Sequence, residues 1–107
     1  MKKAKHKSMR QFNKLTPTQH EAIALLLEEA GEVVQICGKI LRHGLRSRHP
    51  DSYVLNRDEL GKECGDFAAA LAIAIDTGVV SEDVVKQQQP RKLENVQRWL
   101  HHIKVKL

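Results

Sequence analysis

The chain has 107 residues, of which 41% are apolar, and its formal net charge is +5. This length and composition are typical of one domain with a small core. The best candidate for a membrane span is the nine-residue apolar run 67–75, between Asp66 and Asp76. A run of that length is too short to cross a bilayer, which excludes a membrane-spanning helix.

The first eleven residues differ in character from the rest of the chain. Residues 1–11 hold four lysines and one arginine and no apolar stretch. We therefore expect a basic, disordered tail there, no secretory signal peptide, and a single helical domain over 12–107. The two cysteines, Cys37 and Cys64, fall in helical segments, and we expect them to be free, buried thiols of a cytoplasmic protein.

The first predicted helix has a strong start. Residues 16–19 read Thr-Pro-Thr-Gln, which predicts Thr16 as the N-cap of a capping box, with proline at the first helical position. The helix should run to about His43, where Gly44 supplies a left-handed C-cap. Apolar residues at helical spacing predict a wide buried face. They are Ile23, Leu26, Leu27, Ala30, Val33, Val34, Cys37, Ile40 and Leu41.

A loop over residues 45–56 should lead to the second helix, capped by Asn56 and ending at Thr77-Gly78. The loop is long for a compact helical domain, and such loops are often functional or mobile. Residues 67–75 of the second helix are apolar on almost every side. One chain of this size can hardly bury such a helix, so we expect a homo-oligomer, a dimer or a tetramer, built on it.

Ser81 should cap a third, short helix, which Pro90 interrupts; Pro90 starts or kinks the last helix. The last helix should carry Leu93, Val96, Leu100 and Ile103 as its apolar face. No strand pattern rises above noise, so the predicted fold class is all-α.

Two pairs of acids stand within the apolar faces of the first and second helices. Glu29 and Glu32 form one pair, and Glu63 and Asp66 form the other, each with the i, i+3 spacing that places both on one helix face. One such pair alone would be read as ordinary surface acids. Two matched pairs on apolar helices instead predict a site for Mg²⁺ or Mn²⁺, because buried carboxylates must be paired or bind a metal.

Three motifs follow one another along the chain. They are Glu28-Glu29-Ala30-Gly31-Glu32, then Glu63-Cys64-Gly65-Asp66, then Lys92-x-x-Asn95-x-x-Arg98. In this order they resemble the MazG-like family of all-α nucleoside triphosphate pyrophosphohydrolases, whose signature is EExxE followed by ExxD on the next helix. The resemblance covers roughly residues 20–100. The thirty residues between Glu32 and Glu63 are more than is usual in the family, and we place the extra length in the 45–56 loop.

This resemblance implies an oligomeric domain of the four-helix-bundle type that cleaves a (deoxy)nucleoside triphosphate between the α- and β-phosphates, giving the monophosphate and pyrophosphate. It implies Mg²⁺ ligands at Glu29, Glu32, Glu63 and Asp66, with Glu28 as a supporting or water-activating acid. Lys92, Asn95 and Arg98 would approach the triphosphate, in one arrangement across a subunit boundary. Either Glu29 or Glu32 would take the proton of the attacking water. The base, the sugar, and whether the purpose is nucleotide house-cleaning or pool regulation remain open.

Phe12 lies one to two turns before the first helix, where a nucleobase could stack on it, although packing against the helices is an equal alternative. Two other classes of function are compatible with the sequence. A nucleic-acid-binding module would use the basic termini, but no motif with aromatic stacking positions accompanies them. A non-catalytic helical interaction protein would keep the fold without the chemistry.

Overall fold

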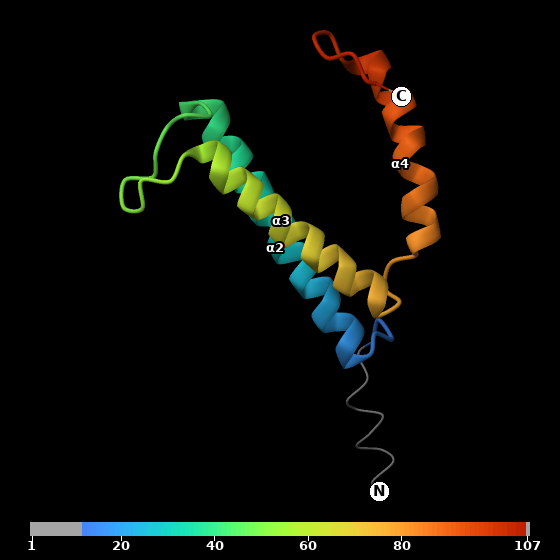
Figure 1. The fold of residues 1–107 in the computed structure, drawn as a ribbon. Coiled ribbons are helices and arrows are strands. Elements are labelled where there is room, and N and C mark those ends of the chain that lie inside the picture. Colours follow the sequence, from blue (N-terminus) through green and yellow to red (C-terminus); the bar gives the residue numbers. More distant parts are fainter. Residues whose placement is uncertain (1–11, 107) are drawn as a thin grey trace, which may run out of the picture.

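The computed structural model describes residues 12–106 and is built from helices (Figure 1). They are α2 (Pro17–His43), α3 (Asn56–Asp76), α4 (Glu82–Val96) and the 3-10 helix η1 (Gln97–Trp99). Within these residues the only β feature is an isolated antiparallel bridge between Arg48 and Leu55. The predicted all-α class is confirmed. The basic tail predicted for 1–11 lies outside the described residues.

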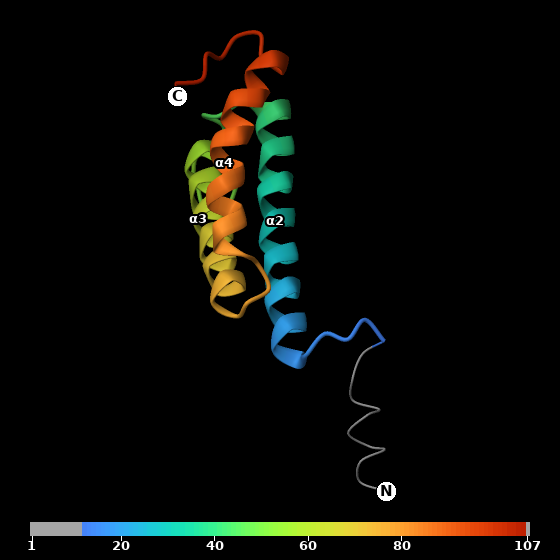
Figure 2. The same cartoon turned by 90° about the vertical axis from the view of Figure 1, so that its right-hand side faces the viewer.

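Helices α2 and α3 form an antiparallel hairpin, and they lie side by side in both views (Figures 1 and 2). The predicted capping box starts α2: Thr16 Oγ1 accepts from Gln19 N at 3.1 Å, and Gln19 Oε1 accepts from Thr16 N at 2.9 Å. Gly44 ends α2 with φ 88° and ψ 167°. The positive φ is as predicted, but this ψ lies outside the left-handed helical region, in a part of conformational space open almost only to glycine.

The connecting loop, residues 44–55, is ordered by its own hydrogen bonds rather than left open. His49 and Val54 pair at 2.9 Å, as do Tyr53 and His49. The prediction that Asn56 caps α3 is wrong, because Leu55 is the N-cap and Asn56 is the first helical residue. The Asn56 side chain is buried and donates to Gly44 O at 3.1 Å. It therefore fastens the start of α3 to the end of α2 instead of capping its own helix.

Helix α4 leaves the end of α3 and packs along neither helix of the hairpin (Figure 1). Ser81 caps it as predicted, accepting from Val84 N at 3.3 Å. The predicted break at Pro90 is wrong, since α4 continues through it. Good helix formers on both sides of Pro90 let the helix resume after the one lost hydrogen bond. Regular helix ends instead after η1, where Leu100 is extended, so the predicted apolar face is not formed beyond Val96.

The apolar core of one chain is very small. Its buried apolar residues are Ala22, Ile36, Ala70 and Ala74. On the opposite side of α2, by contrast, Leu27, Val34 and Leu41 are 73%, 71% and 88% exposed. The expected wide buried face of α2 is thus only half covered by α3.

Cys37 and Cys64 are free thiols, but both are exposed, so their expected burial is wrong for the single chain. None of the helices in residues 12–106 is long and apolar enough to cross a membrane.

Candidate metal centre

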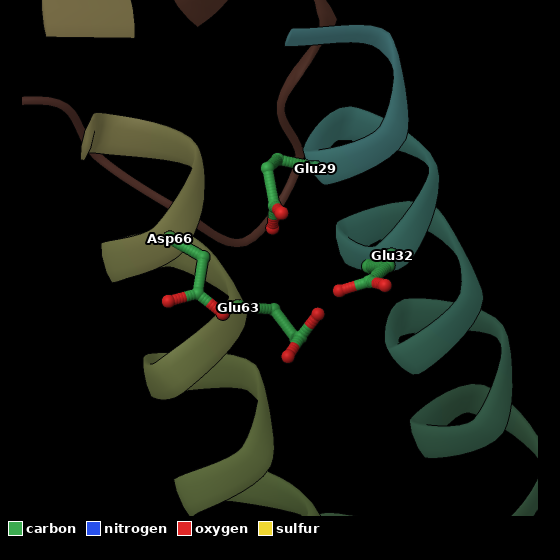
Figure 3. A group of neighbouring side chains, drawn as sticks. All are labelled: Glu29, Glu32, Glu63 and Asp66. Atoms are coloured by element: carbon green, nitrogen blue, oxygen red, sulfur yellow. The ribbon is translucent and has the colours of Figure 1, made fainter. Parts of the chain in front are cut away.

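Four carboxylates meet at the middle of the hairpin, directed into the space between α2 and α3 (Figure 3). Glu29 and Glu32 come from α2, and Glu63 and Asp66 come from α3. Each offers one oxygen, and these four oxygens lie within 4.8 Å of one another. We call these four residues the acid cluster. The i, i+3 spacing on each helix placed each pair on one face, and the antiparallel packing turned the two faces toward each other.

Burial differs across the acid cluster. Glu63 is only 5% exposed, whereas Glu29, Glu32 and Asp66 are half-buried. Ile36 on α2 and Ala70 on α3, each four residues beyond an acid of the cluster, are buried on the same hairpin faces. The carboxylates are therefore held close together in a setting that solvates their charges poorly.

Lys62 supplies the positive charge at the acid cluster. Its ammonium lies 2.9 Å from Glu63 Oε1 and 3.2 Å from Asp66 Oδ2. Both contacts are charge-assisted, and they raise the pKa of Lys62 above its ordinary value. Among residues 12–106 no other lysine or arginine forms an ion pair with an acid of the cluster. One lysine thus faces four carboxyl groups.

Contacts within the acid cluster shift the pKa values of its acids in opposite directions. A hydrogen bond with Glu63, followed by the charge of Glu63, raises the pKa of Glu32 from 4.5 to about 7. The same hydrogen bond and the contact with Lys62 lower the pKa of Glu63. Burial, and then the charge of Asp66, raises the pKa of Glu29. Near neutral pH, therefore, Glu32 and Glu63 share a proton in the absence of a cation.

One oxygen of the acid cluster has no hydrogen-bond partner. Glu29 Oε2 is buried, and no donor among the described residues 12–106 reaches it. Native proteins rarely leave a buried carboxylate oxygen unsatisfied, and a bound ion is one of the partners that such an oxygen can have. An all-oxygen donor set with a net negative charge also matches the preference of Mg²⁺ and Mn²⁺. The residues present fit a divalent cation; that they bind one stays a prediction.

The structure brings the four predicted ligands together but not the other predicted site residues. Glu28 lies beside Glu29 on an exposed side of α2, outside the acid cluster. Phe12 is 96% exposed ahead of α2. Lys92 lines an apolar groove of α4, and Asn95 and Arg98 are exposed near its end. Because α4 diverges from the hairpin (Figure 1), these three do not approach the acids of their own chain.

Sequence reasoning missed Lys62 and a cavity beside the acid cluster. The i, i+4 spacing of Lys62 and Asp66 was the available clue for the lysine. The cavity has a volume of about 430 Å³. Besides Glu32, Lys62 and Glu63, its lining residues are Gln35, Ile36, Lys39, His49, Ser52, Val54, Asn56 and Glu59. It depends on how the connecting loop folds back, which no local pattern predicts.

No known protein family matches this chain, and neither a curated protein nor a solved structure matches it. The resemblance to the MazG-like family therefore rests on the motifs, and the acid cluster is the structural observation that bears on it.

Proposed function

We propose that this protein is a MazG-like, Mg²⁺-dependent nucleoside triphosphate pyrophosphohydrolase. The observation that carries the proposal is the convergence of Glu29, Glu32, Glu63 and Asp66 from two helices into one cluster, with a buried oxygen left unpartnered. Acids that served only as solvated surface would have no reason to face one another across a helix interface, where their repulsion destabilises the fold.

Within this proposal the four carboxylates hold Mg²⁺. The bound ion would neutralise the triphosphate, lower the pKa of the attacking water and stabilise charge on the leaving pyrophosphate. Glu29 or Glu32 takes the proton of that water. Glu32 points into the acid cluster beside Glu63 (Figure 3), where a carboxylate oxygen not bound to the ion would accept that proton. Glu29 has the free oxygen that proton transfer needs. Both remain candidates.

The proposal includes a homo-oligomer in which hairpins from two chains build a four-helix arrangement. A stripe on α2 supports it, with residues spaced alternately by four and three, as in helices that associate. The stripe comprises Ile23, Leu27, Ala30, Val34, Cys37 and Leu41. Its large members are exposed in one chain, while the buried apolar residues within 12–106 are four, three of them alanines. So small a core gives one chain little stability alone, and a second copy would cover the stripe.

Oligomerisation also gives Lys92, Asn95 and Arg98 a route to the substrate. They are remote from the acid cluster of their own chain, because α4 projects away from the hairpin (Figure 1). A projecting helix is suited to reach the hairpin of a neighbouring chain, where its basic residues would offset triphosphate charge.

A pyrophosphate-release assay tests the proposed function. The purified protein is incubated with Mg²⁺ and a panel of ordinary and modified (deoxy)nucleoside triphosphates, including dUTP, dCTP, dGTP and dATP. We expect release of pyrophosphate and a monophosphate, abolished by EDTA and restored by excess Mg²⁺. No release from any substrate by folded, oligomeric protein would overturn the proposal and favour a non-catalytic helical interaction protein.

A further inference from the structure

Two adjoining cavities lie between the acid cluster and the connecting loop. The inner cavity, of about 430 Å³, has Glu32 and Glu63 on its wall and so lies directly beside the acid cluster. A second cavity, of about 270 Å³, follows it. Lys39, His49 and Asn56 line both, so the two cavities are neighbours separated by no more than these side chains. The inner cavity alone is within the range of about 300–1,000 Å³ typical of small-molecule sites.

The second cavity is basic. Lys39, His43, Arg48 and His49 line it, and no carboxylate among the described residues does. We call it the basic cavity. Lys39 forms none of the ion pairs within residues 12–106, so its charge is not offset by an acid there. One additional acid, Glu59, lies on the inner cavity only. Charge therefore changes sign along the two cavities, from acids at one end to bases at the other.

The connecting loop fixes the donors of this cavity. His49 Nδ1 accepts from the backbone N–H groups of Asp51 and Ser52, at 3.1 and 3.3 Å. The proton of a neutral His49 ring is therefore on Nε2, which makes that atom a donor. Arg48 Nη1 donates to Tyr53 O at 2.9 Å, and its other N–H groups remain for a ligand. Side chains held this way lose little freedom when an anion binds.

We propose that the two terminal phosphates of the substrate extend from the acid cluster toward the connecting loop, with Lys39, Arg48 and His49 as their donors. This inference rests on the proposed function and adds a direction to it: the pyrophosphate end faces the connecting loop. A cation-loaded acid cluster next to basic side chains is the arrangement that a chain of phosphates complements.

This direction assigns the basic cavity a part in bond cleavage. The water oxygen bonds to the α-phosphorus, and its proton passes to a carboxylate of the acid cluster. The bond from the α-phosphorus to the bridging oxygen breaks, and its electron pair leaves with pyrophosphate. The added negative charge falls on the group that the basic cavity holds, so Lys39 and Arg48 stabilise the departing group more than the intact substrate.

Calorimetric titration of the full-length protein with inorganic pyrophosphate, in Mg²⁺, tests the inference. We expect Lys39→Gln and His49→Gln each to raise the Kd for pyrophosphate by about tenfold, the usual effect of losing a charge-assisted hydrogen bond. Lys39→Arg should restore binding to within about threefold, because it keeps the charge. The matched control is Lys86→Gln on α4, which loses the same charge from a surface ion pair with Glu82 and should leave the Kd unchanged.

Two parallel titrations make the outcomes distinct. The four deoxynucleoside monophosphates, which lack terminal phosphates, should bind Lys39→Gln and the unmodified protein equally. If Lys39→Gln weakens the monophosphates and spares pyrophosphate, the direction is reversed and the inference is overturned. Mn²⁺ binding, followed by electron paramagnetic resonance, reports on the acid cluster alone. Mn²⁺ bound by the unmodified protein with unchanged pyrophosphate affinity in Lys39→Gln would overturn this inference while leaving the proposed function standing. No Mn²⁺ binding would instead overturn the proposed function.

Discussion

The hairpin and helix α4 carry the two halves of one sequence resemblance, yet only the hairpin assembles its half within a single chain. The acid motifs converge because α2 and α3 pack directly on each other, which turns two helix faces into one site. The basic residues of α4 remain apart, because α4 packs along neither helix. The comparison shows that the acid pairs meet within one chain because their helices pack on each other, whereas α4 has no such helix beside it.

The largest expected effect comes from the acids that the hairpin assembles. Glu32→Gln and Asp66→Asn should each lower turnover by roughly a thousandfold while keeping the helical fold, because each loses a charged oxygen of the site. Turnover and circular dichroism check this. Glu21→Gln and Asp58→Asn, at exposed positions of the same two helices, are matched controls that should remain active. Full activity in either cluster variant would refute the site assignment.

The basic residues of α4 test whether the second half of the site comes from another chain. Arg98→Ala should lower turnover by roughly a hundredfold if Arg98 offsets substrate charge. Glu63→Gln should be inactive for the same reason as the other acid-cluster variants. Mixing the two variants in equal amounts should restore about a quarter of the activity, because half of the dimers are then mixed and each mixed dimer holds one complete site of two. Mixtures that exchange subunits, as shown by a tagged copy, but stay inactive would place Arg98 and Glu63 in the same chain's site or outside it.

A charged substitution can disrupt the α2 stripe without changing the acid cluster or the basic residues of α4. Val34→Asp places a charge on a residue that is 71% exposed in one chain, so the stability of one chain should change little. The charge should be unfavourable only where a partner chain covers this position. We expect self-association to weaken at least about tenfold, measured by sedimentation, because a buried unpaired carboxylate is costly. Ala24→Asp, at an exposed position of α2 beside the stripe, is the control. Equal association of both variants would mean that the stripe is not the interface.

The smallest effect concerns pH. Glu32 has an ordinary pKa of 4.5 and a folded pKa of about 7, so the folded chain keeps a proton that the unfolded chain has released. Its contribution to stability is present below pH 4.5 and is lost as pH rises through about 7. Without metal, Tm should therefore fall by a few degrees between about pH 5.5 and pH 8. The lowered pKa of Glu63 acts in the opposite sense, but below this window.

Mg²⁺ should reverse this trend, since a cation replaces the shared proton and binds better once the proton has left. The rise in Tm on adding Mg²⁺ should be larger at pH 8 than at pH 5.5, as scanning calorimetry can show. In Glu32→Gln the metal-free Tm should change less over the same interval. A metal-free Tm that rises between pH 5.5 and pH 8 would contradict the shared proton.

Short sequence patterns correctly predicted the features that interactions between near neighbours in the chain decide. The capping box at Thr16 and the cap at Ser81 depend on hydrogen bonds within one turn, and both are observed. The meeting of the two acid pairs followed from periodicity and from the packing of adjacent helices. Asn56 and Pro90 were misjudged because their outcome depends on distant partners or on competing helix propensity. The cavities beside the connecting loop could not be predicted from the sequence, because they arise from contacts between segments with no shared pattern.

Lys62 has a consequence for the acid cluster when the proposed cation is absent. Its ammonium is tied to the chain beside Glu63 and Asp66, so neither chelators nor dilution can remove this positive charge. After treatment with EDTA the protein should keep its hairpin and bind a cation again, because the Lys62 ammonium offsets part of the carboxylate charge in the meantime. A divalent ion that enters the acid cluster would have to displace the Lys62 ammonium from Glu63 and Asp66. This competition would lower the apparent affinity of the site for the ion and would suit the site to a cation that is abundant.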